Sequence, residues 1–156
     1  MNSALALSNE ILSRKIRQTG IRPSSARIHV LRYLEEERNH PTVDQIYKAL
    51  LLRLPGLSRA SVYNSLAALE GSRLVRPLTM DGNELRYDAC VADHGHFRCL
   101  ACGGIRDFEL DLSSLRTEGL GGFAVERQDF LAWGFCPDCA ETADAKTNTQ
   151  ADLTVL

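Results

Sequence analysis

Two cysteine pairs constrain the fold of this chain more than any other feature of its sequence. Four of the five cysteines form two CxxC motifs with 33 residues between them, namely Cys99, Cys102, Cys136 and Cys139. Four thiolates presented by two such turns match the closed tetrahedral sulfur site that structural zinc prefers. We therefore predict a structural Zn(II) site at these cysteines. Iron also accepts an all-sulfur ligand set, so the choice of zinc rests on chemistry and on how common each metal is in cells.

A redox function is the alternative for the CxxC motifs. Redox-active pairs occur next to a βαβ pattern, and neither pair here has that context. The first residues lack a basic segment ahead of their apolar ones, so we expect no cleaved secretory signal and no disulfide framework. No apolar run approaches the roughly 20 residues of a membrane helix. We expect a cytoplasmic protein that makes no contact with a membrane.

The first half of the chain has the period of helices. Apolar side chains recur at spacings of three and four, and capping residues and glycines mark the ends. The pattern predicts four helices: one over about residues 6–19, a second beginning near Ser24, a third from Thr42 to residues 54–56, and a fourth from Ser58 to Gly71. The period then changes to two short strands around Asp81 and Gly82, a strong hairpin signal. Helices followed by a hairpin indicate a winged helix-turn-helix.

Charge divides the chain into two halves. Residues 1–87 carry 13 Lys and Arg against 8 Asp and Glu, whereas residues 88–156 carry 5 against 12. A basic first half suits a polyanion, and an acidic second half suits cations. The fourth helix would be the recognition helix, and its polar side chains suit phosphates and base edges. The candidate DNA-binding residues are Arg22, Ser58, Arg59, Ser61, Tyr63 and Asn64. A plain four-helix module with a solvated charged face is the alternative.

The histidines form a second constellation. His94 and His96 are two residues apart, which on a strand puts both imidazoles on one face. Three carboxylates are close to them in sequence: Asp88, Asp93 and Asp107. Such a mixed nitrogen and oxygen set suits Fe(II), Mn(II), Zn(II) or Co(II). The pattern alone leaves a polar strand face equally open. His40 precedes Pro41 and by itself indicates only a surface residue. Cys90 is expected to pack half-buried, with a role as an alternative ligand left open.

The second half predicts a small α+β module. Residues 94–110 favour two strands joined at the first CxxC, residues 112–121 a short helix, and residues 122–139 two more strands that lead into the second CxxC. With 156 residues, there is room for one domain or two small ones. We expect a winged-helix domain over residues 1–83, an α/β domain over residues 84–140 and a polar, loose tail over residues 141–156.

Taken together, these features resemble the ferric uptake regulator family of metal-dependent repressors. The resemblance covers about residues 8–140 and rests on five motifs in order: GIRPSSARIHVLRYL, HPTVDQIYKAL, SRASVYNSLAALEGSRLV, DHGHFRCLACGGIRDF and GFCPDC. It implies a C-terminal dimerisation domain, a homodimer and metal-activated binding to inverted repeats in double-stranded promoter DNA. It also implies a regulatory Fe(II) or Mn(II) site at the domain hinge. The matching positions are His40, Asp88, His94, His96 and Asp107.

Within the family, the sequence is most similar to the peroxide-sensing repressors. Asp107 takes a position where many iron-sensing members carry Glu, and Asp88 takes one where zinc-sensing members often carry Cys. Gly95 and Gln128 stand where many iron regulators have a carboxylate and a histidine of a further metal site. The resemblance therefore implies two metals per subunit. It also implies that Fe(II) and peroxide would oxidise a ligand histidine, His40 or His94, so that the metal leaves and repression ends.

Other functions are compatible with parts of the pattern. An iron- or zinc-responsive uptake regulator of the same family is the nearest alternative, and ligation by Cys90 would favour zinc. A metalloenzyme would use a His/His/Asp site with an open position. No obvious general base or nucleophile accompanies that site, so we expect no enzyme activity. A zinc-ribbon interaction module would leave the helix-turn-helix and the His94–His96 pair unexplained.

Overall fold

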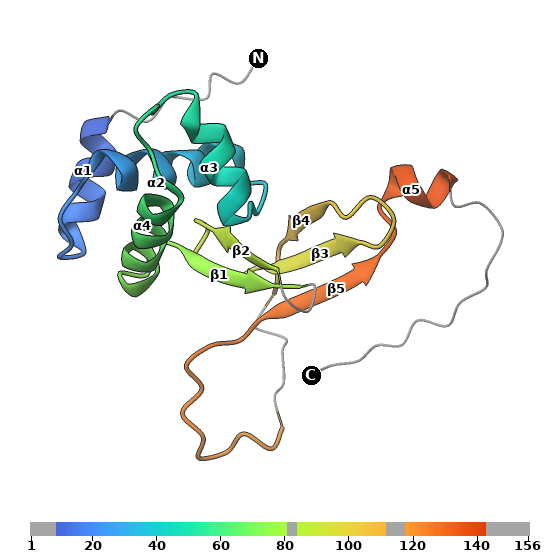
Figure 1. Ribbon diagram of the computed structural model, residues 1–156. Helices are drawn as coiled ribbons and strands as arrows, with labels where there is room; N and C mark the ends of the chain where they lie inside the picture. Colours follow the sequence, from blue (N-terminus) through green and yellow to red (C-terminus); the bar gives the residue numbers. More distant parts are fainter. Residues whose placement is uncertain (1–8, 81–83, 112–117, 143–156) are drawn as a thin grey trace. The chain divides into compact units, whose positions relative to one another are not determined.

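The computed structural model describes residues 9–80, 84–111 and 118–142 (Figure 1). The chain divides into two compact units, residues 1–93 and residues 94–156. The domain boundary expected after residue 83 stays a prediction. None of the helices in the described ranges is long and apolar enough to cross a membrane.

Four helices build the first unit. They are α1 (Asn9–Gln18), α2 (Ser25–Glu37), α3 (Val43–Leu51) and α4 (Arg59–Gly71). Hydroxyl side chains accept backbone N–H bonds at the starts of α2, α3 and α4, as the sequence predicted; these N-caps are Ser24, Thr42 and Ser58. The helix α1 ends before Gly20 as predicted, while its expected beginning lies outside the described residues. The helix α3 ends earlier than predicted, because the chain turns after Leu51.

The helices meet in one apolar core. Ten of its side chains on the helices are at most 2% exposed, namely Leu12, Ile16, Val30, Leu31, Leu34, Ile46, Leu50, Val62, Leu66 and Leu69. Burying each such side chain contributes about 1.5–3 kcal/mol relative to leaving it in water. Val75 and Tyr87 join the same core from the segment after α4. The hairpin is therefore anchored to the helices by shared apolar packing.

The hairpin consists of β1 (Arg76–Thr79) and β2 (Leu85–Asp88), paired antiparallel. Its predicted Asp81–Gly82 turn lies outside the described residues. The strand β2 is tied to the start of α3, because the Tyr87 amide donates to the Pro41 carbonyl at 3.1 Å and Thr42 forms a bridge with Arg86. The helices α3 and α4 followed by this hairpin form the predicted winged helix-turn-helix.

The second unit contains a three-stranded sheet. Its elements are β3 (Gly95–Cys99), β4 (Ile105–Phe108), β5 (Phe130–Gly134) and the short helix α5 (Pro137–Thr142). The strand order is β4-β3-β5, with β3 antiparallel to β4 and parallel to β5. The two strands predicted around the first CxxC are confirmed.

Two expectations for the second unit need comment. The strand predicted ahead of β5 is wrong: residues 123–129 form no strand, and Phe123 is 71% exposed. A segment forms a strand only when a partner strand shares its backbone hydrogen bonds, and within the described ranges this segment pairs with none. Most of the helix predicted over residues 112–121 lies outside the described residues, and the described residues 118–121 are not helical. The helix α5 extends into the first two residues of the predicted tail.

Candidate functional site

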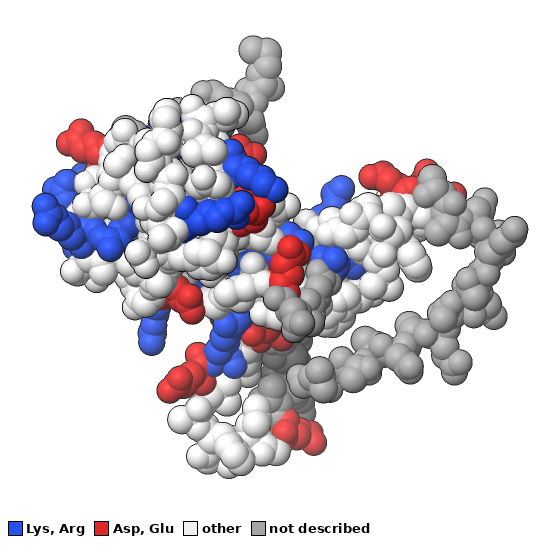
Figure 2. Space-filling view, in the orientation of Figure 1, with Lys and Arg blue, Asp and Glu red and all other residues white. Residues whose placement is uncertain are grey.

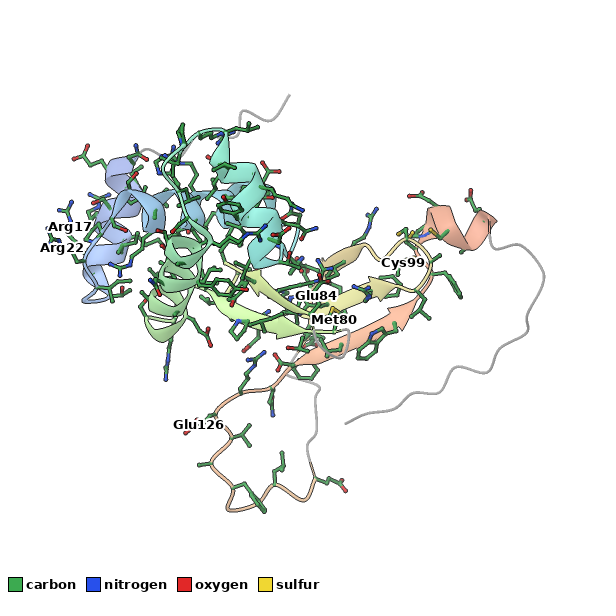
Figure 3. The ribbon with its side chains drawn as sticks, viewed as in Figure 1. Arg17, Arg22, Met80, Glu84, Cys99 and Glu126 are labelled. Atoms are coloured by element: carbon green, nitrogen blue, oxygen red, sulfur yellow. The ribbon has the colours of Figure 1, made fainter. Side chains whose placement is uncertain are left out.

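The four paired cysteines meet at the C-terminal ends of strands β3 and β5. The strand β3 ends at Cys99, which is the register partner of Gly134 at the end of β5. The Leu100 amide donates to the Gly134 carbonyl at 2.7 Å, so the two chain segments stay together beyond the strands. The second CxxC begins two residues after Gly134. Parallel pairing thus brings motifs that are far apart in sequence to one place, where Figure 3 shows Cys99.

The first CxxC is shaped by a tight turn. The Gly103 amide donates to the Cys99 carbonyl at 2.9 Å, and the Cys99 amide donates to the Gly104 carbonyl at 2.9 Å. Gly103 has a φ of 71°, a left-handed conformation that glycine adopts without steric cost. In the second motif the amides of Cys139 and Ala140 both donate to the Cys136 carbonyl. Each turn therefore points two sulfur atoms to the same side.

The sulfur geometry fits a tetrahedral ion. The four Sγ atoms all lie within 4.8 Å of one another. Cys102 Sγ and Cys136 Sγ are 3.9 Å apart. Four sulfurs about 2.3 Å from a central zinc lie about 3.8 Å from each other, so the observed separation is that of a metal site. None of the four is in a disulfide. The predicted gathering of these cysteines is present.

Electrostatics point to the same chemistry. Backbone hydrogen bonds from Cys102 and then Cys136 lower the pKa of Cys99 to about 6. Hydrogen bonds with the sulfurs of Cys136 and Cys99 raise the pKa of Cys139 to about 12. Thiolates this close repel each other, so one of them holds its proton strongly. A divalent cation removes this conflict, because coordinating thiols are deprotonated outright.

In the second unit, two imidazoles and a carboxylate converge. His96 on β3 is the register partner of Asp107 on β4, and His94 immediately precedes β3. The Nε2 atoms of His94 and His96 are 3.0 Å apart. Asp107 Oδ1 lies 3.6 Å from His94 Nε2 and 3.7 Å from His96 Nε2. The hairpin between β3 and β4 thus assembles three of the predicted regulatory ligands.

This cluster has the chemistry of a metal half-site. Two nitrogens about 2.1 Å from one ion and at right angles to each other are about 3.0 Å apart, which equals the observed Nε2–Nε2 distance. Both imidazoles are buried, whereas Asp107 is 36% exposed. A hydrogen bond from one ring N–H to the other ring nitrogen satisfies the same distance. The nitrogen and oxygen donor set suits Fe(II), Mn(II) or Zn(II).

The other two predicted ligands lie together in the first unit. His40 precedes α3 with a φ of 47°, and Asp88 ends β2. A ring nitrogen of His40 and a carboxylate oxygen of Asp88 lie within 4.8 Å of each other. Arg86 donates to the His40 carbonyl at 3.0 Å, which fixes the backbone at this residue. His40 is 2% exposed, so the expectation of a surface residue is wrong.

Asp88 is held from two sides. Arg76 Nε lies 3.1 Å from its Oδ2, and the Cys90 amide donates to its Oδ1 at 2.7 Å. Each carboxylate oxygen has a second lone pair for a cation. Sequence spacing gave no sign of Arg76, because its position opposite Asp88 depends on the hairpin register. The Cys90 side chain is half-buried, and Asp93, the third nearby carboxylate, is exposed.

The predicted DNA-binding residues divide into two groups. Ser58 and Ser61 are engaged in the cap of α4, where the Ser61 amide donates to Ser58 Oγ and the two hydroxyls are 2.9 Å apart. The other predicted contacts are exposed, namely Arg22, Arg59, Tyr63 and Asn64. Figure 2 shows Lys and Arg side chains over the helices of this unit, and Figure 3 places Arg22 beside Arg17.

Sequence reasoning missed the partners of Arg59. Its guanidinium forms an ion pair with Asp44 and lies 4.8 Å from the centroid of the Tyr47 ring. Both partners are on α3, the first helix of the helix-turn-helix. Asp44 also pairs with Lys48 at 2.6 Å, and only this pair has a spacing, i to i+4, that the sequence could have revealed.

Comparisons with known proteins agree on one family. The model of the family described as "Ferric uptake regulator family" matches residues 18–129. Among curated relatives, the peroxide operon regulator of Bacillus subtilis is 36% identical over 129 residues, which cover 81% of this chain and 89% of that protein.

Solved structures with a similar fold include two bacterial regulators. The Helicobacter pylori ferric uptake regulator matches with a TM-score of 0.68 and 21% identity, covering 91% of this chain and 98% of that one. The Campylobacter jejuni peroxide stress regulator matches with a TM-score of 0.62 and 25% identity, covering 83% and 97%.

Proposed function

The chain belongs to the ferric uptake regulator family, and on that premise we propose that it is a metal-dependent repressor of transcription in the cytoplasm. It binds inverted repeats in double-stranded DNA as a homodimer, and hydrogen peroxide is its signal. The observation that carries the choice of signal is the extended similarity to the peroxide operon regulator of Bacillus subtilis. The convergence of His94, His96 and Asp107 supports it, because these donors suit iron or manganese.

The four-cysteine site is assigned a structural role. Four sulfur ligands occupy all four coordination positions of a tetrahedral zinc ion, which leaves none for a substrate or water. Zn(II) at Cys99, Cys102, Cys136 and Cys139 would tie the end of β3 to the end of β5. Its contribution is to the folding of the second unit rather than to sensing.

The regulatory ion is assigned to the remaining donors. Within the second unit they are His94, His96 and Asp107, and within the first unit they are His40 and Asp88. Joining the two groups into one Fe(II) or Mn(II) site rests on the family's motif positions. An ion that takes ligands from both units favours one arrangement of the DNA-binding unit. Metal then raises DNA affinity and, by linkage, DNA raises metal affinity by the same factor.

Peroxide sensing uses the ligand histidines as the oxidised groups. Fe(II) held by these residues would supply redox chemistry that Mn(II) does not: it would give an electron to cleave the O–O bond of hydrogen peroxide and recover one from the imidazole that is oxidised. In the net reaction one oxygen atom of peroxide is inserted into a C–H bond of the His40 or His94 imidazole, and the other leaves as water. The oxidised imidazole is a poor ligand, so the metal leaves and the affinity for DNA falls.

Mass spectrometry of the full chain tests this function. The zinc-loaded protein is charged with Fe(II) or Mn(II), exposed briefly to hydrogen peroxide and digested. We expect one added oxygen, about 16 Da, on the His40 or His94 peptide of the iron sample only, with Cys and Met oxidation assigned separately. Absence of histidine oxidation in both samples would contradict peroxide sensing and favour an iron- or zinc-responsive uptake regulator.

DNA binding is tested by its salt dependence. For metal-loaded protein, the logarithm of the affinity for duplex DNA should fall linearly with the logarithm of the salt concentration. Binding that is absent with and without Mn(II) would contradict a repressor function and favour an interaction module.

A further inference from the structure

Arg59 is held at the start of the candidate recognition helix by two residues of α3. Its guanidinium pairs with the Asp44 carboxylate and lies 4.8 Å from the centroid of the Tyr47 ring. The Arg59 side chain is 55% exposed, so the contacts cover part of the fork and leave the rest open to a ligand. Arg59 is therefore restrained and accessible at the same time.

Fold stability does not account for this arrangement. Exposed ion pairs contribute about 0–1 kcal/mol, and Asp44 already has a second cationic partner in Lys48. The geometry instead restricts the rotamers of a long side chain before any ligand arrives. The planar fork of arginine then loses less freedom for each hydrogen bond that it forms.

The carboxylate also determines what Arg59 can bind. Phosphate contacts depend on net positive charge, and Asp44 cancels much of the charge of Arg59. Hydrogen bonds to a base edge depend more on the direction of the donor groups than on net charge. The commonest specific contact in the major groove is an arginine fork on O6 and N7 of guanine.

We propose that Arg59 recognises a guanine edge in the major groove, and that Asp44 and Tyr47 are positioning residues that hold its guanidinium for this contact. The proposal rests on the DNA-binding function proposed above. It gives Arg59 a role in selecting the DNA sequence rather than in contacting the phosphate backbone of the DNA.

In vitro selection on the full chain tests the proposal. Zinc- and Mn(II)-loaded protein selects from a random-sequence duplex library, and affinities are then measured against salt for the enriched duplex and for an unrelated one. The variants are Arg59→Ala, Arg59→Lys, Asp44→Asn and the double variant Asp44→Asn/Arg59→Ala. Lys48→Ala is the matched control, because it removes the other partner of Asp44. Circular dichroism and zinc content verify that each variant folds.

The expected pattern differs between affinity and preference. Arg59→Ala and Arg59→Lys should lose guanine preference at one position of each half-site by about 5- to 150-fold. Asp44→Asn should lower the guanine preference about tenfold. It should also bind the unrelated duplex more tightly, with a salt slope steeper by about one. In the Arg59→Ala background, Asp44→Asn should no longer change the preference. Lys48→Ala should keep it.

Three results would overturn the proposal. The first is that Arg59→Ala weakens binding to every duplex equally and lowers the salt slope by about one, which is the signature of a phosphate contact. The second is that Asp44→Asn changes the guanine preference equally with and without Arg59, which would place its effect elsewhere. A wild-type protein that selects no sequence would overturn the DNA-binding function itself, and the proposal with it.

Discussion

The ring of Phe108 occupies the space that a side chain on Gly95 would need. The two residues are register partners on β4 and β3, and a Cβ on Gly95 would lie 2.1 Å from Phe108 Cζ. Gly95 stands between His94 and His96, so the aromatic ring packs directly on the strand that presents both imidazoles. The place where many iron regulators carry a carboxylate is filled here by an aromatic ring.

Gly95→Ala should therefore destabilise the second unit. Overpacking of this kind typically costs about 1–3 kcal/mol, and shortening Phe108 to Ala in the same chain should recover part of it. Chemical denaturation of Gly95→Ala, Phe108→Ala and the double variant gives the coupling between the two residues. Gly56→Ala is the control, because nothing lies within 4 Å of a Cβ at that position. Additive effects of the two substitutions would show that the ring does not limit residue 95.

Removal of zinc should affect the two units differently. The core of the first unit contains none of the four paired cysteines, whereas the C-terminal ends of β3 and β5 lead directly into them. A strong chelator, or Cys102→Ser, should lower amide protection in β3 and β5 more than about tenfold and leave α4 protected. Hydrogen exchange read by mass spectrometry measures this, with Cys90→Ser as the control. Equal loss of protection in α4 would mean that the units fold as one.

The features that were predicted correctly are those that depend on local chemistry. A hydroxyl at Ser24, Thr42 or Ser58 accepts a hydrogen bond from the backbone N–H three residues later, so a helix start is visible in sequence. The CxxC motifs likewise carry their ligand geometry within four residues. The strand predicted in residues 123–129 failed because a local pattern describes one segment, while strand pairing needs a second.

Site partners that come from different elements were beyond sequence reasoning. Asp44 and Arg59 are 15 residues apart and meet only because α3 and α4 pack together. His40 is 2% exposed, and Arg86 on the neighbouring strand donates a hydrogen bond to its carbonyl. The resemblance to a family named His40 as a ligand, but spacing alone gave no reason to bury it.

High pH should weaken the first unit through Tyr87. Burial, followed by the charge of Glu70 and then Tyr63, raises the pKa of Tyr87 above its ordinary value of 10.0. The unfolded chain therefore loses the phenol proton first. The stability that Tyr87 contributes is complete below pH 10 and is lost as the pH rises through the folded-state pKa. Tyr87→Phe should flatten this decline in urea unfolding followed by the helical signal between pH 8 and 11. A decline as steep as that of the wild type would contradict the assignment.

The regulatory and structural metals should be separable by mutation. His96 is 1% exposed and its Nε2 lies 3.0 Å from His94 Nε2 and 3.7 Å from Asp107 Oδ1, so it sits at the centre of its half-site. His96→Ala should lower Mn(II) affinity by at least about tenfold, since loss even of a residue that supports a ligand costs 10–100-fold. Zinc content should stay unchanged, because the cysteines are a separate cluster. By linkage, the Mn(II)-dependent gain in DNA affinity should shrink as well. Equilibrium dialysis with elemental analysis measures both metals. Joint loss of zinc and manganese would instead mean that His96 supports the fold of the whole sheet.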